Sequence, residues 1–139
     1  MKSYLIKKDQ NGNKIIQKPI NNESASWGSV FPFYNSVTSI GERGLYYAFY
    51  GCVGLTGSIS FPNLTYIGES GLNHAFYGCT GLTSVSFPDL TDIGVLGLDG
   101  TFYGCAGLKE VHFKSSLSGN SQCTASNMGC SNATIYFDL

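Results

Sequence analysis

The tetrapeptide Phe-Tyr-Gly-Cys occurs three times in the chain, at Phe49–Cys52, Phe76–Cys79 and Phe102–Cys105. The cysteines that end the three copies are 27 and 26 residues apart. Self-similarity at a fixed period of this length is the signature of a repeat architecture, in which each unit packs against the next. The repeat therefore decides the fold before any single helix or strand is assigned.

The residues on both sides of the tetrapeptide recur in register as well. An Ile-Gly pair precedes each copy, a Gly-Leu pair follows it, and a short apolar stretch such as Val85–Pro88 closes it. A fourth, degenerate copy ends the chain, with Gly129-Cys130 in the Gly-Cys place and Ala133–Phe137 in the place of the closing stretch. Degeneracy is expected there, because the last coil faces water on one side.

One copy can be interpreted element by element. Apolar and small polar residues alternate along 81–87, which predicts a strand with Val85 and Phe87 turned inward and Pro88 at its end. Leu90 and Ile93 form a second inward set on a turn or short strand. In the preceding copy, Ser70 caps a predicted short helix that ends near Tyr77 and buries Leu72, Ala75 and Phe76. One such unit cannot bury its apolar side alone, so three or four coils should stack.

These patterns resemble the BspA-like leucine-rich repeats of bacterial and protozoan surface proteins over roughly residues 30–137. The resemblance rests on Leu82-Thr83-Ser84-Val85, Pro88, Leu90–Gly94 and Ala75–Cys79. The present repeats are a few residues longer than the family norm, with the extra residues around Gly71-Leu72. The resemblance implies an α/β solenoid: a right-handed coil with a parallel strand ladder and short helical turns. It also implies attachment to hosts or recognition of proteins.

The chain is expected to have two parts. Residues 1–26 are predicted to form an N-terminal β-hairpin or cap, because Tyr4–Lys8 and Lys14–Lys18 flank the turn signal Asn11-Gly12. Residues 27–139 are predicted to form the solenoid, with about four coils. The net charge of −1 favours no nucleic acid partner, and no segment is long and apolar enough to insert into a membrane. The chain shows no secretory signal, and we expect the protein to be located on a cell surface or on a phage particle.

The chemistry-bearing residues do not form a catalytic or metal-binding motif. Cys52, Cys79, Cys105 and Cys130 recur once per copy without a Cys-x-x-Cys pair, and Cys123 falls where the other copies have leucine, so buried packing thiols are predicted. His74 and His112 are isolated. The acidic residues near Asp92 lack the pattern of a calcium loop. We therefore expect a protein that is not an enzyme, with no cofactor and no metal.

Two sets of recurring residues remain as candidate binding surfaces. The first is a ladder of tyrosines, each following an inward phenylalanine; its alternative role is to cover the turns and stiffen them. The second is the open face of the strands, where small polar residues align. The expected partner is a protein or glycan on another surface; the alternative is a structural spacer or tip in an assembly such as a phage tail appendage, and oligomerisation stays open. The candidate residues are Tyr50, Tyr77 and Tyr103 for the ladder, and Ser58, Ser84, Glu110, Ser60, Ser86 and His112 for the strand face.

Overall fold

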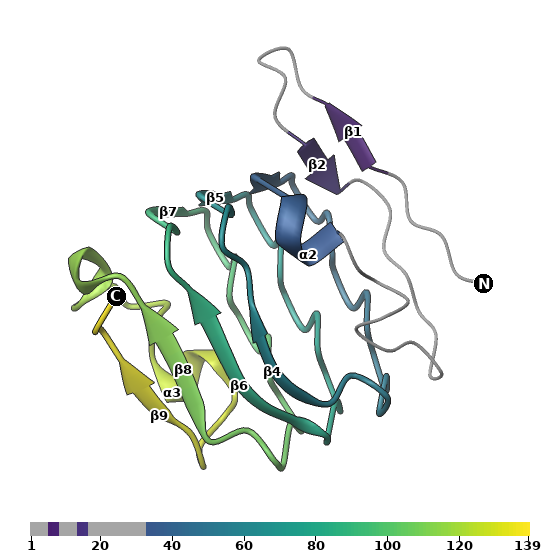
Figure 1. Cartoon of the computed structure of the whole chain (residues 1–139), viewed down its shortest axis with the longest axis vertical. Coiled ribbons are helices and arrows are strands. Elements are labelled where there is room, and N and C mark those ends of the chain that lie inside the picture. Colours follow the sequence, from purple (N-terminus) through teal and green to yellow (C-terminus); the bar gives the residue numbers. More distant parts are fainter. Residues whose placement is uncertain (1–5, 9–13, 17–32) are drawn as a thin grey trace.

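The structure is a computed structural model, and it describes residues 6–8, 14–16 and 33–139 (Figure 1). In this part of the chain, short strands are joined by turns and wound into stacked coils, which confirms the predicted solenoid. The elements are β1 Ile6–Lys8, β2 Lys14–Ile16, α2 Phe33–Ser36, β3 Ser39–Ile40, β4 Gly57–Ser60, β5 Tyr66–Ile67, β6 Leu82–Phe87, β7 Asp92–Ile93, β8 Glu110–Phe113, the 3-10 helix Ser115–Leu117, α3 Ala125–Met128 and β9 Thr134–Tyr136.

Two sheets run along the length of the solenoid. The long-strand sheet has the order β4-β6-β8-β9 and is parallel throughout, with one strand from each coil. The short-strand sheet has the order β1-β2-β3-β5-β7, and its strands β2, β3, β5 and β7 pair in parallel. Strand β6 ends at Phe87, directly before Pro88, as predicted from the missing N–H donor of proline.

At the N-terminal end, β1 and β2 pair antiparallel, with Lys7 opposite Ile15. This pairing is the arrangement that the hairpin prediction requires. The predicted Asn11-Gly12 turn and the boundary at residues 26 and 27 lie outside the described residues. The role of the hairpin as a cap therefore stays a prediction.

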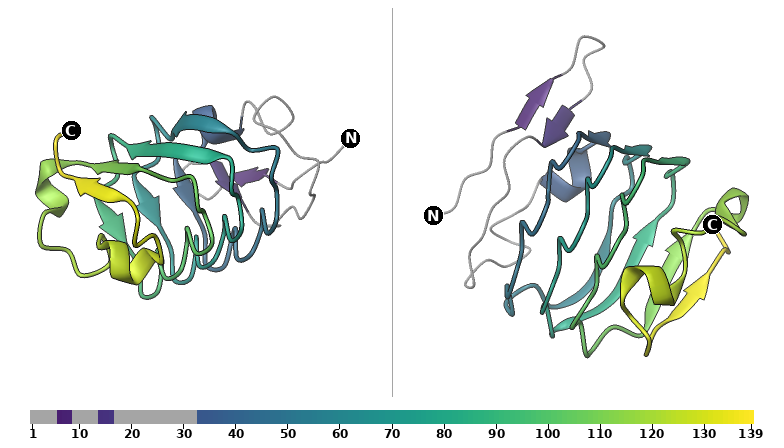
Figure 2. Two further views of the ribbon diagram at one scale, coloured as in Figure 1. Left: turned by 90° about the horizontal axis from the view of Figure 1, so that it is seen from below. Right: turned by 180° about the vertical axis from the view of Figure 1, so that it is seen from behind.

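The third side of each coil, which we call the turn face, consists of residues 43–52, 70–79 and 96–105. The helix predicted from Ser70 to near Tyr77 is wrong, because these residues form successive turns instead. Alternate N–H groups bond to the next coil, such as Leu72 to the Gly97 carbonyl at 2.9 Å, whereas those between them bond three residues back, such as Ala75 to Leu72 at 3.0 Å. The view from behind in Figure 2 shows these segments as parallel zigzags.

The spacing of the coils explains why no helix forms there. An α-helix with its side chains is ~10 Å wide, whereas strands paired in a sheet lie ~4.8 Å apart. Direct backbone hydrogen bonds between coils hold the turn face at a spacing like that of paired strands, so α-helices on successive coils would collide there. The turns also place every fourth residue in the left-handed region, at Ser70 (φ 53°), His74 (φ 54°) and Gly78 (φ 76°), a conformation that an α-helix excludes.

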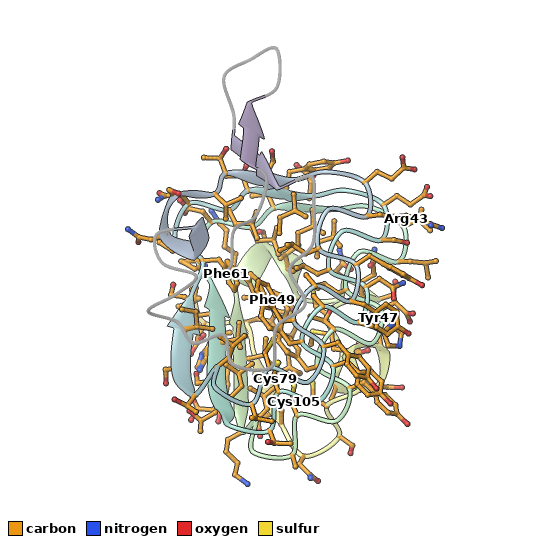
Figure 3. The ribbon with its side chains drawn as sticks, turned by 90° about the vertical axis from the view of Figure 1, so that its right-hand side faces the viewer. Arg43, Tyr47, Phe49, Phe61, Cys79 and Cys105 are labelled. Atoms are coloured by element: carbon orange, nitrogen blue, oxygen red, sulfur yellow. The ribbon has the colours of Figure 1, made fainter. Side chains whose placement is uncertain are left out.

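The core is filled by columns of equivalent side chains. Phe49, Phe76 and Phe102 are fully buried and stack with ring centroids 5.1 and 5.9 Å apart. A second column runs through Phe61 and Phe87, 5.3 Å apart, and on into the later coils. Figure 3 shows the labelled Phe49 and Phe61 inside the coil. The predicted inward set is also found, with Leu90 fully buried and Ile93 partly buried.

The cysteines form a column of buried thiols, as predicted. The Sγ of Cys79 donates to the Phe49 carbonyl at 3.1 Å, and that of Cys105 donates to the Phe76 carbonyl at 3.0 Å. Burial raises the pKa of the Cys105 thiol to about 12. Cys123 is buried in the leucine position of its coil, with 1% of its surface exposed. All five cysteines are free thiols and act as packing groups.

The side chain of Gln122 closes the turn face at the last coil, a role that sequence reasoning missed. Its amide nitrogen donates to the Gly94 carbonyl at 2.8 Å, and its oxygen accepts from the Leu98 N–H at 3.2 Å. One coil earlier, the equivalent Leu72 N–H bonds to a backbone carbonyl of the following coil. A side-chain amide therefore stands in for the backbone that the degenerate coil does not supply.

Candidate binding surfaces

The three recurring tyrosines form a continuous ladder across the turn face, as predicted. The rings of Tyr50 and Tyr77 are 4.9 Å apart and 15° from parallel, and those of Tyr77 and Tyr103 are 5.1 Å apart and 23° from parallel. Tyr50 is 46% exposed and Tyr103 is 53% exposed. Each ring lies one residue beyond a buried phenylalanine, so the turn geometry carries it to the outer surface.

A second aromatic column lies beside this ladder. The rings of Tyr47 and His74 stack at 4.8 Å and 10°, and Tyr46 contacts Tyr47 edge-on at 4.7 Å. The guanidinium of Arg43 lies over the Tyr46 ring, 5.5 Å from its centroid; Figure 3 shows the labelled Arg43 and Tyr47 on the outer side of the coil. We call this surface the aromatic turn face; it comprises Tyr46, Tyr47, Tyr50, His74, Tyr77 and Tyr103.

Sequence reasoning missed the second column, although a signal was present. Tyr47 and His74 each stand two residues before the phenylalanine of their copy, so they occupy equivalent positions. Both have a positive φ, near 53°, which side chains rarely adopt and which costs ~1–2 kcal/mol. The third coil has Gly100 there, and a Cβ at this glycine would lie 2.6 Å from atoms of the His74 ring. The column therefore ends where the His74 ring lies against the Gly100 backbone.

The aromatic turn face is almost free of formal charge. No Lys, Arg, Asp or Glu occurs from Gly44 to Gly68 or from Ser70 to Pro88. Partial burial, together with the neighbouring phenols, raises the pKa of Tyr47, so this ring stays neutral at physiological pH. Charges stand only at its margins, including Arg43 in the first coil and Asp99 in the third. Charge depletion combined with exposed aromatic rings is the composition of a protein interface core.

The predicted alignment of the strand face is confirmed. Ser58 pairs with Ser84 and Ser84 with Glu110, and two residues further along the strands Ser60, Ser86 and His112 form the second row. Ser58 and Glu110 are exposed, whereas Ser84, Ser86 and His112 are half-buried. The short hydroxyls leave this face flat and able to make only weak individual contacts.

His112 is held between two carboxylates on this face. Its Nε2 lies 2.7 Å from Glu110 Oε1, its Nδ1 lies 2.9 Å from Asp138 Oδ1, and its ring stacks on Tyr136 at 4.7 Å. Partial burial pushes the pKa of His112 down, but the bonds to Asp138 and Glu110 outweigh it, so this pKa lies above its ordinary value. Asp138 is 26 residues away in the chain, which explains why the sequence left His112 isolated.

The described residues form no metal site, and the depression between the last two coils does not resemble a ligand pocket. They contain no group of three or more His, Cys, Asp or Glu side chains placed to hold a metal ion. A depression of about 220 Å³ between the third and fourth coils is lined by small residues, including Gly104, Ala106 and Ser131. Ligand pockets usually measure ~300–1,000 Å³ and contain converging polar groups, so this depression is too small and too plain to serve as one.

The stacked coils, the parallel ladder and the columns of Leu, Phe and Cys place the protein in the class of leucine-rich-repeat solenoids. The sequence profile described as "BspA type Leucine rich repeat region (6 copies)" matches residues 25–138, so the chain belongs to the BspA-type leucine-rich-repeat family. No curated protein and no solved structure matches the chain. Repeats of this family are in general non-enzymatic scaffolds that mediate protein interactions. Among the described residues, no helix has the length and apolar character needed to cross a membrane.

Proposed function

We propose that this protein is a non-enzymatic binding or adhesion module of a bacterial or phage surface protein, and that it binds its partner through the aromatic turn face. The single observation that carries this proposal is the uncharged ladder of Tyr50, Tyr77 and Tyr103, in which Tyr50 and Tyr103 are exposed and Tyr77 is half-buried. Tyrosine is enriched among the residues that dominate binding energy, because a large ring is buried at little cost in side-chain entropy.

The backbone beneath the ladder supports the proposal. Along the turn face every second N–H bonds to the next coil, as in Tyr47 to Asn73 at 3.1 Å and Gly51 to Tyr77 at 2.8 Å. The rings are therefore held in place before a partner arrives, and little conformational entropy remains to be lost on binding. The strand face supports binding less well, because its small hydroxyls would have to act by summation along the array.

The test is an array of glycans and of host and bacterial surface proteins, probed with the purified protein and with the triple variant Tyr50→Ala, Tyr77→Ala, Tyr103→Ala. We expect the wild type to bind array members and the triple variant to lose at least tenfold in affinity. The matched control is Tyr66→Ala, since Tyr66 is 45% exposed but lies on β5, in the short-strand sheet. Thermal melting checks that each variant is folded.

An array on which the wild type binds nothing would overturn the proposed function. Binding that survives in the triple variant would show that the binding surface lies outside the ladder. The strand-face variant Ser58→Ala, Ser84→Ala, Ser86→Ala is then the informative comparison, because it removes hydroxyls without disturbing the core.

A further inference from the structure

The ladder leaves no ring face open at its centre. The ring of Tyr77 has Tyr50 on one side at 4.9 Å and Tyr103 on the other at 5.1 Å, both close to parallel. The outer side of Tyr103 is also approached, because a Cβ at Gly129 would lie 3.0 Å from its Cδ2. A sugar ring that binds an aromatic side chain packs flat on an open face. The stacked rings therefore disfavour a glycan and present ring edges and phenol hydroxyls instead.

The phenol hydroxyls of the ladder are complementary to those of an identical ladder. Within the described part of the chain, the hydroxyls of Tyr50, Tyr77 and Tyr103 have no hydrogen-bond partner. A phenol hydroxyl both donates and accepts, so a row of them can pair with an identical row. The distance between neighbouring hydroxyls in the row is set by the distance between neighbouring coils. A second copy of this chain has the same distance between its coils, so its row of hydroxyls matches.

The charges at the margins are arranged for a partner that runs in the opposite direction. Asp99 occupies the place in the third coil that Tyr46 occupies in the first, and the Arg43 guanidinium lies over the Tyr46 ring. Reversing a second copy therefore brings Arg43 near the partner's Asp99. Among the described residues the Arg43 side chain has no carboxylate partner, and its guanidinium lies only over the ring of Tyr46.

We propose that a second copy of this chain docks on the aromatic turn face in the reverse direction, with the two-fold axis at the Tyr77 rung. Tyr50 then faces the partner's Tyr103, Tyr77 faces its own equivalent, and Arg43 pairs with the partner's Asp99 at both ends. A two-fold contact of this kind is self-complementary and closed, so it produces a dimer and not a fibre. This inference rests on the proposed function, because it names a partner for the same ladder.

The experiment is sedimentation velocity of the purified full chain over a range of concentrations, followed by single variants. The wild type, of 14.9 kDa, is expected to sediment with the mass of a dimer at high concentration and of a monomer at low concentration. Tyr77→Ala is expected to raise the midpoint concentration at least tenfold, and Tyr66→Ala to leave it unchanged. A wild type that stays monomeric throughout would overturn the inference.

A charge exchange tests the direction of docking without touching the packed rings. Arg43→Asp and Asp99→Arg are each expected to weaken the dimer, because each places like charges opposite each other. The double variant is expected to restore the dimer, since the opposite charges then meet again with their places exchanged. Aspartate tolerates the positive φ of residue 43, and both sites lie at the margin of the surface, so the fold is preserved. Failure of the double variant to recover would overturn the reversed arrangement.

The two proposals can fail separately. A monomeric wild type that binds an array member and loses it in the triple tyrosine variant would keep the proposed function and overturn self-docking. A dimer that is broken by Tyr77→Ala while every array member stays unbound would support self-docking and count against recognition of a foreign ligand.

Discussion

The thiol of Cys79 donates a hydrogen bond to the backbone carbonyl of Phe49 in the preceding coil, over a distance of 3.1 Å. The contact repeats one coil later between Cys105 and Phe76. These two thiols therefore do more than fill space, because each is a second donor to a core carbonyl that already accepts from a backbone N–H. Replacing sulfur changes both the packing and this hydrogen bond.

The buried thiols should be unreactive in the folded protein. Burial raises the pKa of Cys105 and of Cys123 to about 12, so neither thiol is ionised at neutral pH and neither is reached by reagents. We expect the native protein to react with a thiol reagent at least a hundredfold more slowly than the protein in denaturant. The folded pKa of Cys105 is raised above the ordinary 9.0. The stability contributed by its neutral, buried thiol is therefore complete below pH 9 and is lost as pH rises toward about 12. Fast labelling of the native state would contradict the buried column.

The stability that the His112 bridge contributes should also depend on pH, in a lower range than that of the cysteines. Both ring nitrogens lie within 2.9 Å of a carboxylate oxygen, and only the protonated imidazole can donate to both Glu110 and Asp138. The raised pKa means that the stabilisation is complete below the ordinary pKa of 6.5 and is lost as pH rises through the folded value. We expect Asp138→Asn to lower the His112 pKa and to cost under ~1 kcal/mol, since the pair is exposed. An NMR titration that finds the wild-type pKa at or below 6.5 would contradict this bridge.

Gly100 should not tolerate a side chain. Gly100→Ala adds a Cβ 2.6 Å from the His74 ring and places alanine at φ 60°, so we expect a loss of ~2–4 kcal/mol in the free energy of unfolding. The control is Gly57→Ala, where φ is also positive but nothing lies within 4 Å, and ~1–2 kcal/mol is expected. Removing the His74 ring in the double variant Gly100→Ala, His74→Ala should bring the loss in the free energy of unfolding down to that of Gly57→Ala. Denaturant titration measures all three, and equal losses at Gly100 and Gly57 would contradict the contact.

Gln122 should be needed to close the turn face. Gln122→Ala leaves the Leu98 N–H without its acceptor and the Gly94 carbonyl without one of its donors, for an expected loss of ~1–3 kcal/mol. Gln122→Glu keeps an acceptor for Leu98 but cannot donate to the Gly94 carbonyl, so it should be destabilising as well. Ser121→Ala changes an exposed neighbour and serves as the control. The measurement is thermal melting, with faster hydrogen exchange at Leu98; an unchanged exchange rate would argue against the closing role.

The stacked tyrosine ladder could be predicted from the sequence, but its surroundings could not. The repeat places Tyr50, Tyr77 and Tyr103 at equivalent positions, and equivalent positions of a solenoid must lie side by side. The stack of Tyr47 on His74 joins residues of different type at such positions, so identity alone does not reveal it. The binding role of either column stays a prediction.

The sequence by itself determined which residues are equivalent, and therefore the coils, the parallel register of Ser58, Ser84 and Glu110, and the buried columns, because a recurring pattern can bury its apolar side only by stacking on its copies. Tertiary structure alone decided the backbone of the turn face, where local propensity favoured a helix from Ser70. The ~4.8 Å spacing between stacked coils leaves no room for one. The Gln122 closure and the link from His112 to Asp138 were likewise decided there, since both join residues whose proximity exists only once the coils are stacked.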